Sequence, residues 1–232
     1  YEEAVVEFRA ALREMNEDGV RLDLARALRM AKHPQDAEAE LDLLEAKGFK
    51  PEGVLTERAA LQREAKDWAR AEALLKKALA VSPDYAEAHM QLGRLYEVQD
   101  RWEDATAAYR RATKSDPRHG EAFNQLGLAL RKLGRTDEAV KVFEQTIQAI
   151  PDLPGPYNNL GLIYRERGDL EKAAAVLETG VEMAPKSATL RNSLGSLLHD
   201  SGRLDDAIEQ IQKAVENDPK NAESLSNLAV LL

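Results

Sequence analysis

The apolar residues of this chain recur in a pattern that repeats every 34 residues without a gap. When each repeat is numbered so that Ala86 is position 1, apolar residues occupy positions 4, 7, 8 and 11, and again positions 20, 24 and 27. Spacings of three and four residues are typical of one face of an amphipathic helix. Each repeat therefore predicts two helices, helix A over about positions 1–14 and helix B over about positions 17–31.

Three further positions have a constant size or residue type. Position 8 is always Ala or Gly, and in the six full repeats position 24 is always large and position 20 is always Ala: Ala37, Ala71, Ala105, Ala139, Ala173 and Ala207. Small residues at positions 8 and 20 predict a close crossing of helices A and B, with the residue at position 24 filling space toward the next repeat. Gly in the turn after helix A, as at Gly134, supplies a left-handed helix end. Pro at position 32, as at Pro117, ends helix B.

The period accounts for the whole chain. Full repeats run over 18–51, 52–85, 86–119, 120–153, 154–187 and 188–221, residues 1–17 form helix B of a partial repeat, and residues 222–232 start a further repeat. A single helical hairpin cannot bury its apolar faces, whereas stacked hairpins share one core. We therefore expect one solenoid over residues 1–232. Because it starts within a helix B and stops within a helix A, we expect it to be a fragment of a longer protein.

The repeats from 86 to 221 closely resemble the tetratricopeptide repeat (TPR) family. The resemblance is carried most clearly by Leu92, Gly93, Tyr96, Ala105, Tyr109, Ala112 and Pro117. It implies an all-α fold of helix-turn-helix repeats stacked in a right-handed superhelical solenoid, and a role as a scaffold that binds other proteins. The N-terminal repeats depart from the family pattern, since Arg58 and Gln62 replace a Leu and an aromatic residue and Phe49 stands where Pro is usual.

Composition excludes several other classes of function. Asp and Glu outnumber Lys and Arg by 41 to 32, and the net charge of −9 argues against binding to nucleic acid. No apolar run of about 18 residues occurs, so we expect no direct insertion into a membrane. Cys is absent, which excludes disulfides and thiolate metal sites. No feature assigns a compartment, and the cytoplasm is the default expectation.

The sequence contains no convincing catalytic set. The histidines fall in different repeats without metal-ligand spacing: His33, His89, His119 and His199. No glycine-rich phosphate loop, GxSxG elbow or HExxH motif occurs. The many carboxylates fall on exposed helix positions and at helix starts, where they solvate and cap the helices. We therefore predict that the chain is not an enzyme and has no catalytic residue, metal or cofactor.

In the family that the chain resembles, helix A lines the concave face through positions 2, 5, 6, 9, 12 and 13. Amides and arginines at these positions are the predicted partner-binding residues: Asn124, Gln125, Asn158, Asn159, Asn192, Asn227, Arg94, Arg131 and Arg165. Amide side chains both donate and accept hydrogen bonds, so a row of them can bind the backbone of an extended peptide. Arginines can add contacts to carboxylates or phosphates. We therefore expect a protein or peptide partner in the concave groove.

Two resemblances within the family refine this expectation. The amide row partly resembles the asparagine ladder of O-linked N-acetylglucosamine transferases. The carboxylate clamp of chaperone cofactors is absent, because position 9 is Asn in no repeat. Three alternatives stay open: a TPR arm of a larger enzyme such as a glycosyltransferase, self-association through the uncapped ends, and binding on the convex face or the loops.

Overall fold

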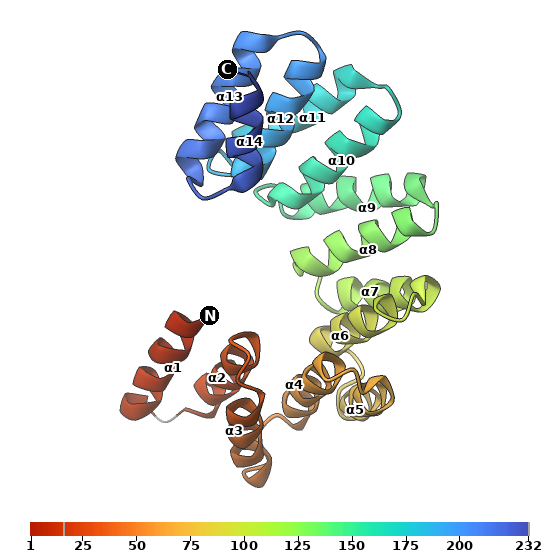
Figure 1. The fold of residues 1–232 in the computed structure, drawn as a ribbon. Coiled ribbons are helices and arrows are strands. Elements are labelled where there is room, and N and C mark those ends of the chain that lie inside the picture. The colour runs from red at the N-terminus through yellow and green to blue at the C-terminus, as the bar shows by residue number, and fades with distance from the viewer. Residues whose placement is uncertain (16, 232) are drawn as a thin grey trace. The chain divides into compact units, whose positions relative to one another are not determined.

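The computed structural model describes residues 1–15 and 17–231, and within them it contains fourteen α-helices and no strand (Figure 1). The helices are α1 Glu2–Met15, α2 Asp18–Met30, α3 Pro34–Ala46, α4 Pro51–Glu64, α5 Trp68–Val81, α6 Ala86–Glu97, α7 Trp102–Ser115, α8 Gly120–Lys132, α9 Thr136–Ala149, α10 Pro154–Glu166, α11 Leu170–Met183, α12 Ala188–Asp200, α13 Leu204–Asn217 and α14 Ala222–Leu231. Even-numbered helices correspond to helix A and odd-numbered helices to helix B. The prediction of an all-α fold built from helical hairpins is confirmed.

The chain divides into two compact units, which we call the N-terminal unit (Tyr1–Asp116) and the C-terminal unit (Pro117–Leu232). Within each unit, the two helices of a repeat pack against each other, and helix B also packs against helix A of the following repeat. Successive helices A touch as well, as α2 does with α4 and α10 with α12. Each unit thus presents neighbouring helices A on one surface, and this surface carries the predicted site residues.

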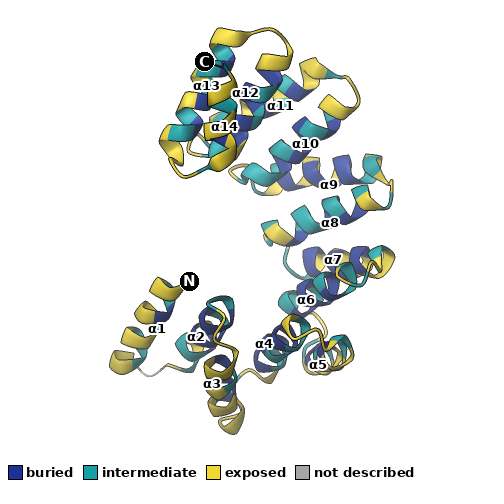
Figure 2. Cartoon of the chain, viewed as in Figure 1, coloured by how far each residue is buried: buried dark blue, intermediate teal, exposed yellow. Residues whose placement is uncertain are grey.

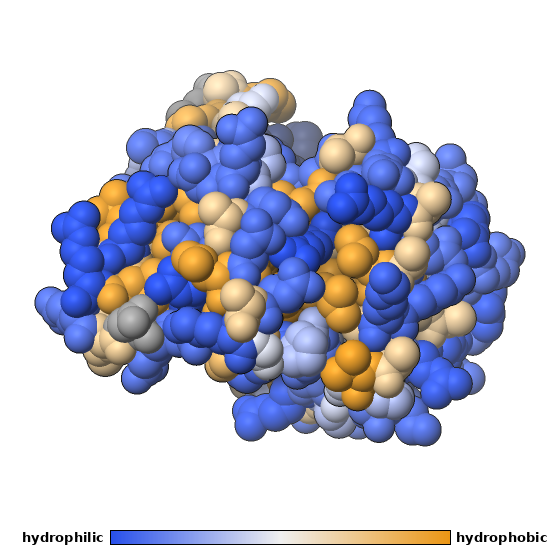
Figure 3. All heavy atoms as spheres, turned by 90° about the horizontal axis from the view of Figure 1, so that it is seen from below, coloured by the Kyte–Doolittle hydropathy of each residue, from blue (hydrophilic) through white to orange (hydrophobic). Residues whose placement is uncertain are grey.

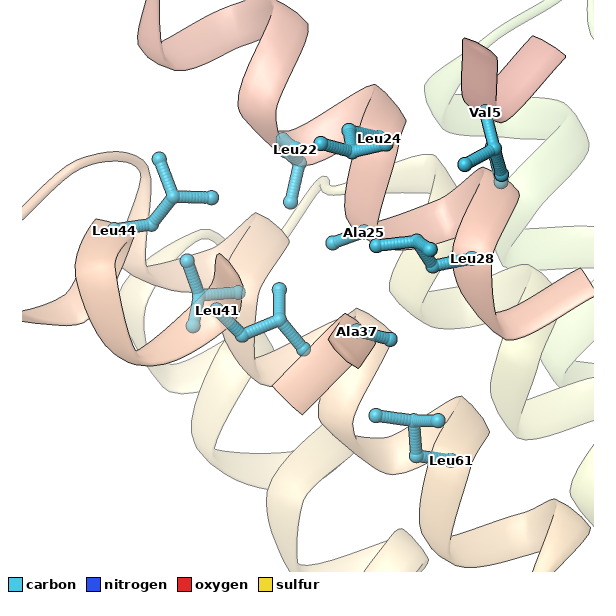
Figure 4. Packing of buried hydrophobic residues seen from close by; sticks show 11 residues of the cluster. Val5, Leu22, Leu24, Ala25, Leu28, Ala37, Leu41, Leu44 and Leu61 are labelled. Atoms are coloured by element: carbon cyan, nitrogen blue, oxygen red, sulfur yellow. The ribbon is translucent and has the colours of Figure 1, made fainter. Parts of the chain in front are cut away.

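Apolar side chains form the core of each unit. Figure 2 marks the buried residues along the helices in dark blue. In the N-terminal unit, Leu24 and Leu28 of α2 pack with Leu41 and Leu44 of α3, and all four are at most 1% exposed (Figure 4). The constant alanine at position 20 is fully buried in every helix B from α3 to α13: Ala37, Ala71, Ala105, Ala139, Ala173 and Ala207. Polar side chains cover much of the surface seen in Figure 3, with apolar side chains appearing between them.

The large residue at position 24 lies over the small residue at position 8 of its own repeat. A Cβ atom built on Gly93 would lie 2.3 Å from Cε1 of Tyr109, and one built on Gly127 would lie 2.2 Å from Cζ of Phe143. The sequence pattern placed the large residue toward the next repeat. The structure shows that it also fills the space opened by the missing Cβ atom in its own repeat, so the glycine and the ring form one packing unit.

A residue in the left-handed conformation stands at position 15 of every complete repeat, in the turn between helices A and B. Gly134, Gly168 and Gly202 have φ of 73°, 78° and 77°, so the predicted glycine helix ends are confirmed. Earlier repeats place a residue with a Cβ atom there, and Asp100 has φ of 56°. The left-handed region is unfavourable for such residues because Cβ approaches the following carbonyl oxygen.

Asp100→Gly is therefore expected to raise the free energy of unfolding by about 0.5–1 kcal/mol. Relief of the left-handed strain, about 1–2 kcal/mol, exceeds the extra backbone entropy that glycine loses on folding, about 0.5–1 kcal/mol. Urea unfolding followed by tryptophan fluorescence measures the change, and Gly168→Ala, monitored by circular dichroism, should show a loss of similar size. A destabilised Asp100→Gly variant would contradict this account of the turn.

Candidate functional surface

We call the surface formed by positions 5, 6, 9, 12 and 13 of the helices A the A face, and describe it separately for each unit. Arg94 lies on α6 of the N-terminal unit, where it is half-buried. The other predicted site residues lie on α8, α10, α12 and α14 of the C-terminal unit. The structure therefore brings the amides together on one unit, and Arg94 belongs to the other.

The amides of the C-terminal unit are hydrogen-bonded between neighbouring repeats. Nδ2 of Asn159 donates to Oδ1 of Asn124 at 2.7 Å, and Nδ2 of Asn227 donates to Oδ1 of Asn192 at 2.9 Å. Oγ of Ser193 donates to Oδ1 of Asn158 at 2.6 Å. In each pair, position 6 donates to position 5 of the preceding repeat. The polar row that the sequence predicted is thus a ladder that ties consecutive helices A together.

These hydrogen bonds divide the amides into two groups. Asn159 and Asn192 are only 8% and 4% exposed, so they act mainly between repeats. Asn124 and Asn158 are half-buried, and their Oδ1 atoms accept the ladder bonds. Among the described residues, no hydrogen bond uses their Nδ2 groups. Both side chains therefore keep donors available for a ligand. Gln125 and Asn227 are also half-buried.

A hollow of about 280 Å³ lies where these donors meet. Its lining consists of Asn124, Leu128, Pro154, Gly155, Asn158, Asn159 and Thr189. Gly155 keeps it open, since a Cβ atom there would lie 3.2 Å from Oδ1 of Asn124. A second, smaller hollow of about 80 Å³ includes Arg165 and Asn192. The larger hollow combines apolar walls with amide donors, the mixture found in sites that bind organic ligands.

The two predicted arginines of the C-terminal unit are paired with acids of the next repeat. Nη2 of Arg131 donates to both carboxylate oxygens of Glu166 at 2.7 and 2.8 Å. Arg165 pairs with Asp200 through Nη2, and its Nη1 lies 3.5 Å from Oγ of Ser196. Exposed ion pairs of this kind contribute little to stability. These arginines can therefore exchange their partners for a ligand's carboxylate at small cost.

The N-terminal unit carries a buried ionic cluster that the sequence pattern did not predict. Glu57 is 2% exposed, and its carboxylate accepts from Nε of Arg26 at 2.7 Å and from Nε of Arg29 at 3.2 Å. Nη1 of Arg29 also donates to Glu64 at 2.5 Å. Burial disfavours the charged form of Arg26, but the nearby acids, Glu57 first among them, together raise the pKa of Arg26. The buried Glu57 at position 6 contradicts the expectation that the carboxylates lie on exposed positions.

The histidines have ordinary structural contacts. Nδ1 of His119 accepts from the backbone N–H of Ala122 at 3.2 Å and so caps α8, while Nε2 of His89 lies 2.9 Å from the carbonyl oxygen of Pro83. Within residues 1–15 and 17–231, no group of three or more metal-ligating side chains is arranged to hold a metal ion. No helix in the same residues is long and apolar enough to cross a membrane.

Comparison with known proteins identifies the family. The family model described as "Tetratricopeptide repeat" matches residues 56–112, 91–154 and 158–222, which together span more than half of the chain. The chain therefore belongs to the tetratricopeptide repeat family. No curated protein matches it significantly.

Solved TPR structures share the fold. YrrB, described as a TPR protein with an unusual peptide-binding site, is 21% identical with a TM-score of 0.54, covering 82% of this chain and 97% of its own. TTC0263, a TPR protein from Thermus thermophilus, is 22% identical with a TM-score of 0.57, covering 78% of this chain and 98% of its own. MamA is 25% identical with a TM-score of 0.57, covering 71% and 96%.

Proposed function

We propose that this chain binds an extended or helical segment of a partner protein on the A face of its C-terminal unit. TPR chains are generally interaction scaffolds without catalytic activity, and the family and fold support that role for this one. The proposal adds a place and a mode of binding. Its recognition groups are the Nδ2 donors of Asn124 and Asn158, with Leu128 and Pro154 as apolar contacts.

The observation that carries this proposal is the pair of amide donors in the larger hollow. An extended peptide has backbone carbonyl oxygens that need donors once water is removed, because an unpaired buried carbonyl is costly. Asn124 and Asn158 offer such donors without reading the peptide's side chains. The ladder bonds fix both amides through their oxygens, so little side-chain entropy is lost when a ligand binds.

The double variant Asn124→Asp and Asn158→Asp tests this proposal. Asp keeps the oxygen that accepts each ladder bond but removes the amide donor, so the fold is expected to persist. A partner captured from the source lysate by the parent chain should bind the variant about tenfold more weakly or worse, as measured by calorimetry on the identified segment. Alanine at Asn159 or Asn192 is a poorer test, because both side chains are buried in the ladder.

A matched control adds the same two charges away from the A face. Asn221 caps α14 through Oδ1, which accepts from the N–H of Ser224 at 2.9 Å, and Asp caps a helix equally well. Gln148 is exposed on α9. The variant Asn221→Asp and Gln148→Glu should therefore bind the partner like the parent. Equal binding by the Asn124/Asn158 variant, with unchanged circular dichroism, would place the binding site elsewhere.

A further inference from the structure

A recurring ion pair links successive helices A of this chain. An arginine at position 12 pairs with an acid at position 13 of the next repeat, 35 residues later. The pairs are Arg29 with Glu64, Arg131 with Glu166, and Arg165 with Asp200. This rule places a carboxylate beside each of these guanidinium groups. The geometry of the repeat therefore creates a place for a carboxylate beside the side chain at position 12.

Arg63 on α4 departs from the rule. It also occupies position 12, but position 13 of the next repeat is Val98, an apolar residue that is 50% exposed. The Nε atom of Arg63 is buried and has no hydrogen-bond partner among the described residues. None of the described carboxylates forms an ion pair with its guanidinium group. The place beside Arg63 that corresponds to the carboxylate of the other three repeats can therefore be occupied by a group from outside the chain.

The acids around Arg63 are engaged elsewhere. Glu57 accepts from Arg26 and Arg29, and Glu64 accepts from Arg29 and lies 3.4 Å from Nζ of Lys32. Glu97, the nearest acid of α6 in sequence to Val98, accepts from the hydroxyl of Tyr109 at 2.7 Å. The carboxylates that could compensate Arg63 from within the chain therefore already have donors.

The surroundings of Arg63 favour an incoming anion. Burial and the like charges of Arg94 and Arg29 lower the pKa of Arg63, against the smaller opposing effects of Glu64 and Tyr109. A half-buried guanidinium without a carboxylate partner bears the cost of desolvation until an anion compensates its charge. Two parallel N–H donors on one edge of a guanidinium suit a carboxylate. The attraction is local, because the chain as a whole carries a net charge of −9.

We propose that Arg63 binds the side-chain carboxylate of an acidic residue in a partner protein, at the place where other repeats of the chain hold their own Glu or Asp. The carboxylate accepts from the guanidinium edge, and the exposed side chain of Val98 packs against the aliphatic part of the same residue. A carboxylate is favoured over a phosphate because the equivalent place in three other repeats is occupied by a carboxylate.

The test follows the Nε–H resonance of Arg63 in ¹⁵N-labelled protein, assigned by its loss in Arg63→Lys. The probes are the blocked tripeptide Ala-Glu-Ala, its counterpart Ala-Gln-Ala, and inorganic phosphate. We expect a saturable shift with the Glu peptide and at least tenfold weaker binding of the Gln peptide. The Nε–H resonance of Arg29 is the internal control, because its carboxylate partners are already in place.

A second variant tests the site without removing the arginine. Val98→Glu introduces an acid at position 13. Its carboxylate is expected to pair with Arg63 and to lower the affinity for the Glu peptide at least tenfold. Val98→Gln is the matched neutral control and should retain binding. The proposal is overturned if the Arg63 resonance does not move, if the Gln peptide or phosphate binds as well as the Glu peptide, or if Val98→Glu leaves the titration unchanged.

This test is independent of the peptide site proposed for the C-terminal unit. Arg63 and Val98 belong to the N-terminal unit, and the probes need no natural partner. Loss of partner binding in the Asn124/Asn158 variant, with no response of Arg63, would support the first site and refute the second. A response of Arg63, with unchanged partner binding by the Asn124/Asn158 variant, would support Arg63 as a carboxylate site. It would also show that the two amides do not bind the partner.

Discussion

Glu57→Ala is expected to lower the free energy of unfolding of the N-terminal unit by about 3–5 kcal/mol, the usual cost of removing one partner of a buried ion pair. Glu57 is 2% exposed and Arg29 is 8% exposed, so water cannot replace the lost carboxylate beside Arg29. Both tryptophans, Trp68 and Trp102, lie in this unit. Urea unfolding followed by tryptophan fluorescence therefore reports the change in the unit that contains the cluster.

Two controls separate the charge cluster from a general effect of truncation. Glu209→Ala removes the exposed pair with Lys213 on α13, followed by circular dichroism, and should cost less than about 1 kcal/mol. The double variant Glu57→Leu and Arg29→Met replaces the buried pair by apolar groups and should recover most of the loss, since buried ion pairs are often no better than such groups. If Glu57→Ala were as mild as Glu209→Ala, the cluster would contribute little to the stability of this unit.

The helices could be predicted from the sequence because the signal is local and repeated. Apolar residues at helical spacing fix which face of each helix is buried, and the alanine at position 20 marks where two helices cross. Ala105 and Ala173 are indeed fully buried. Each repeat shows the same pattern, so a departure from it in one repeat does not change the predicted helices.

The site could be predicted only in part, because its geometry depends on contacts between repeats. The sequence shows Asn124 and Asn159 as candidates, but not that one donates to the other across 35 residues. The sequence offers Arg131 and Arg165 as ligand-binding groups, but each pairs with an acid at position 13 of the next repeat, Glu166 and Asp200. Side-chain pairing between repeats is set by packing geometry, which spacing within one repeat does not reveal.

Glu57 is the clearest case of this limit. Acidic residues are rarely buried, so a carboxylate on a helix is normally taken as exposed. The missing signal was the pair of arginines at positions 9 and 12 of the preceding repeat, Arg26 and Arg29, which lie on the same helix face as each other. An acid that faces two arginines in a stacked array can be buried because both donate to it.

Gly127→Ala is expected to lower the free energy of unfolding of the C-terminal unit by about 1–2 kcal/mol, the net of overpacking and helix propensity. Alanine is favoured over glycine in a helix by about 1 kcal/mol, so propensity alone predicts a gain. The new Cβ atom would lie 2.2 Å from Cζ of Phe143, whose ring is fully buried and cannot swing into solvent. Overpacking of this kind typically costs about 1–3 kcal/mol or more. Urea unfolding followed by circular dichroism measures the loss, because both tryptophans lie in the other unit.

The double variant Gly127→Ala and Phe143→Leu is expected to be more stable than Gly127→Ala alone. The chain itself shows why: Ala25 accompanies Leu41 at positions 8 and 24, as Ala59 accompanies Leu75, and both pairs are buried. Alanine at position 8 is therefore compatible with a leucine but not with a ring. A favourable coupling between the two substitutions would establish the glycine and the ring as one packing unit. A neutral Gly127→Ala variant would show that the ring can shift aside, and that the missing Cβ atom does not determine how closely α8 and α9 approach.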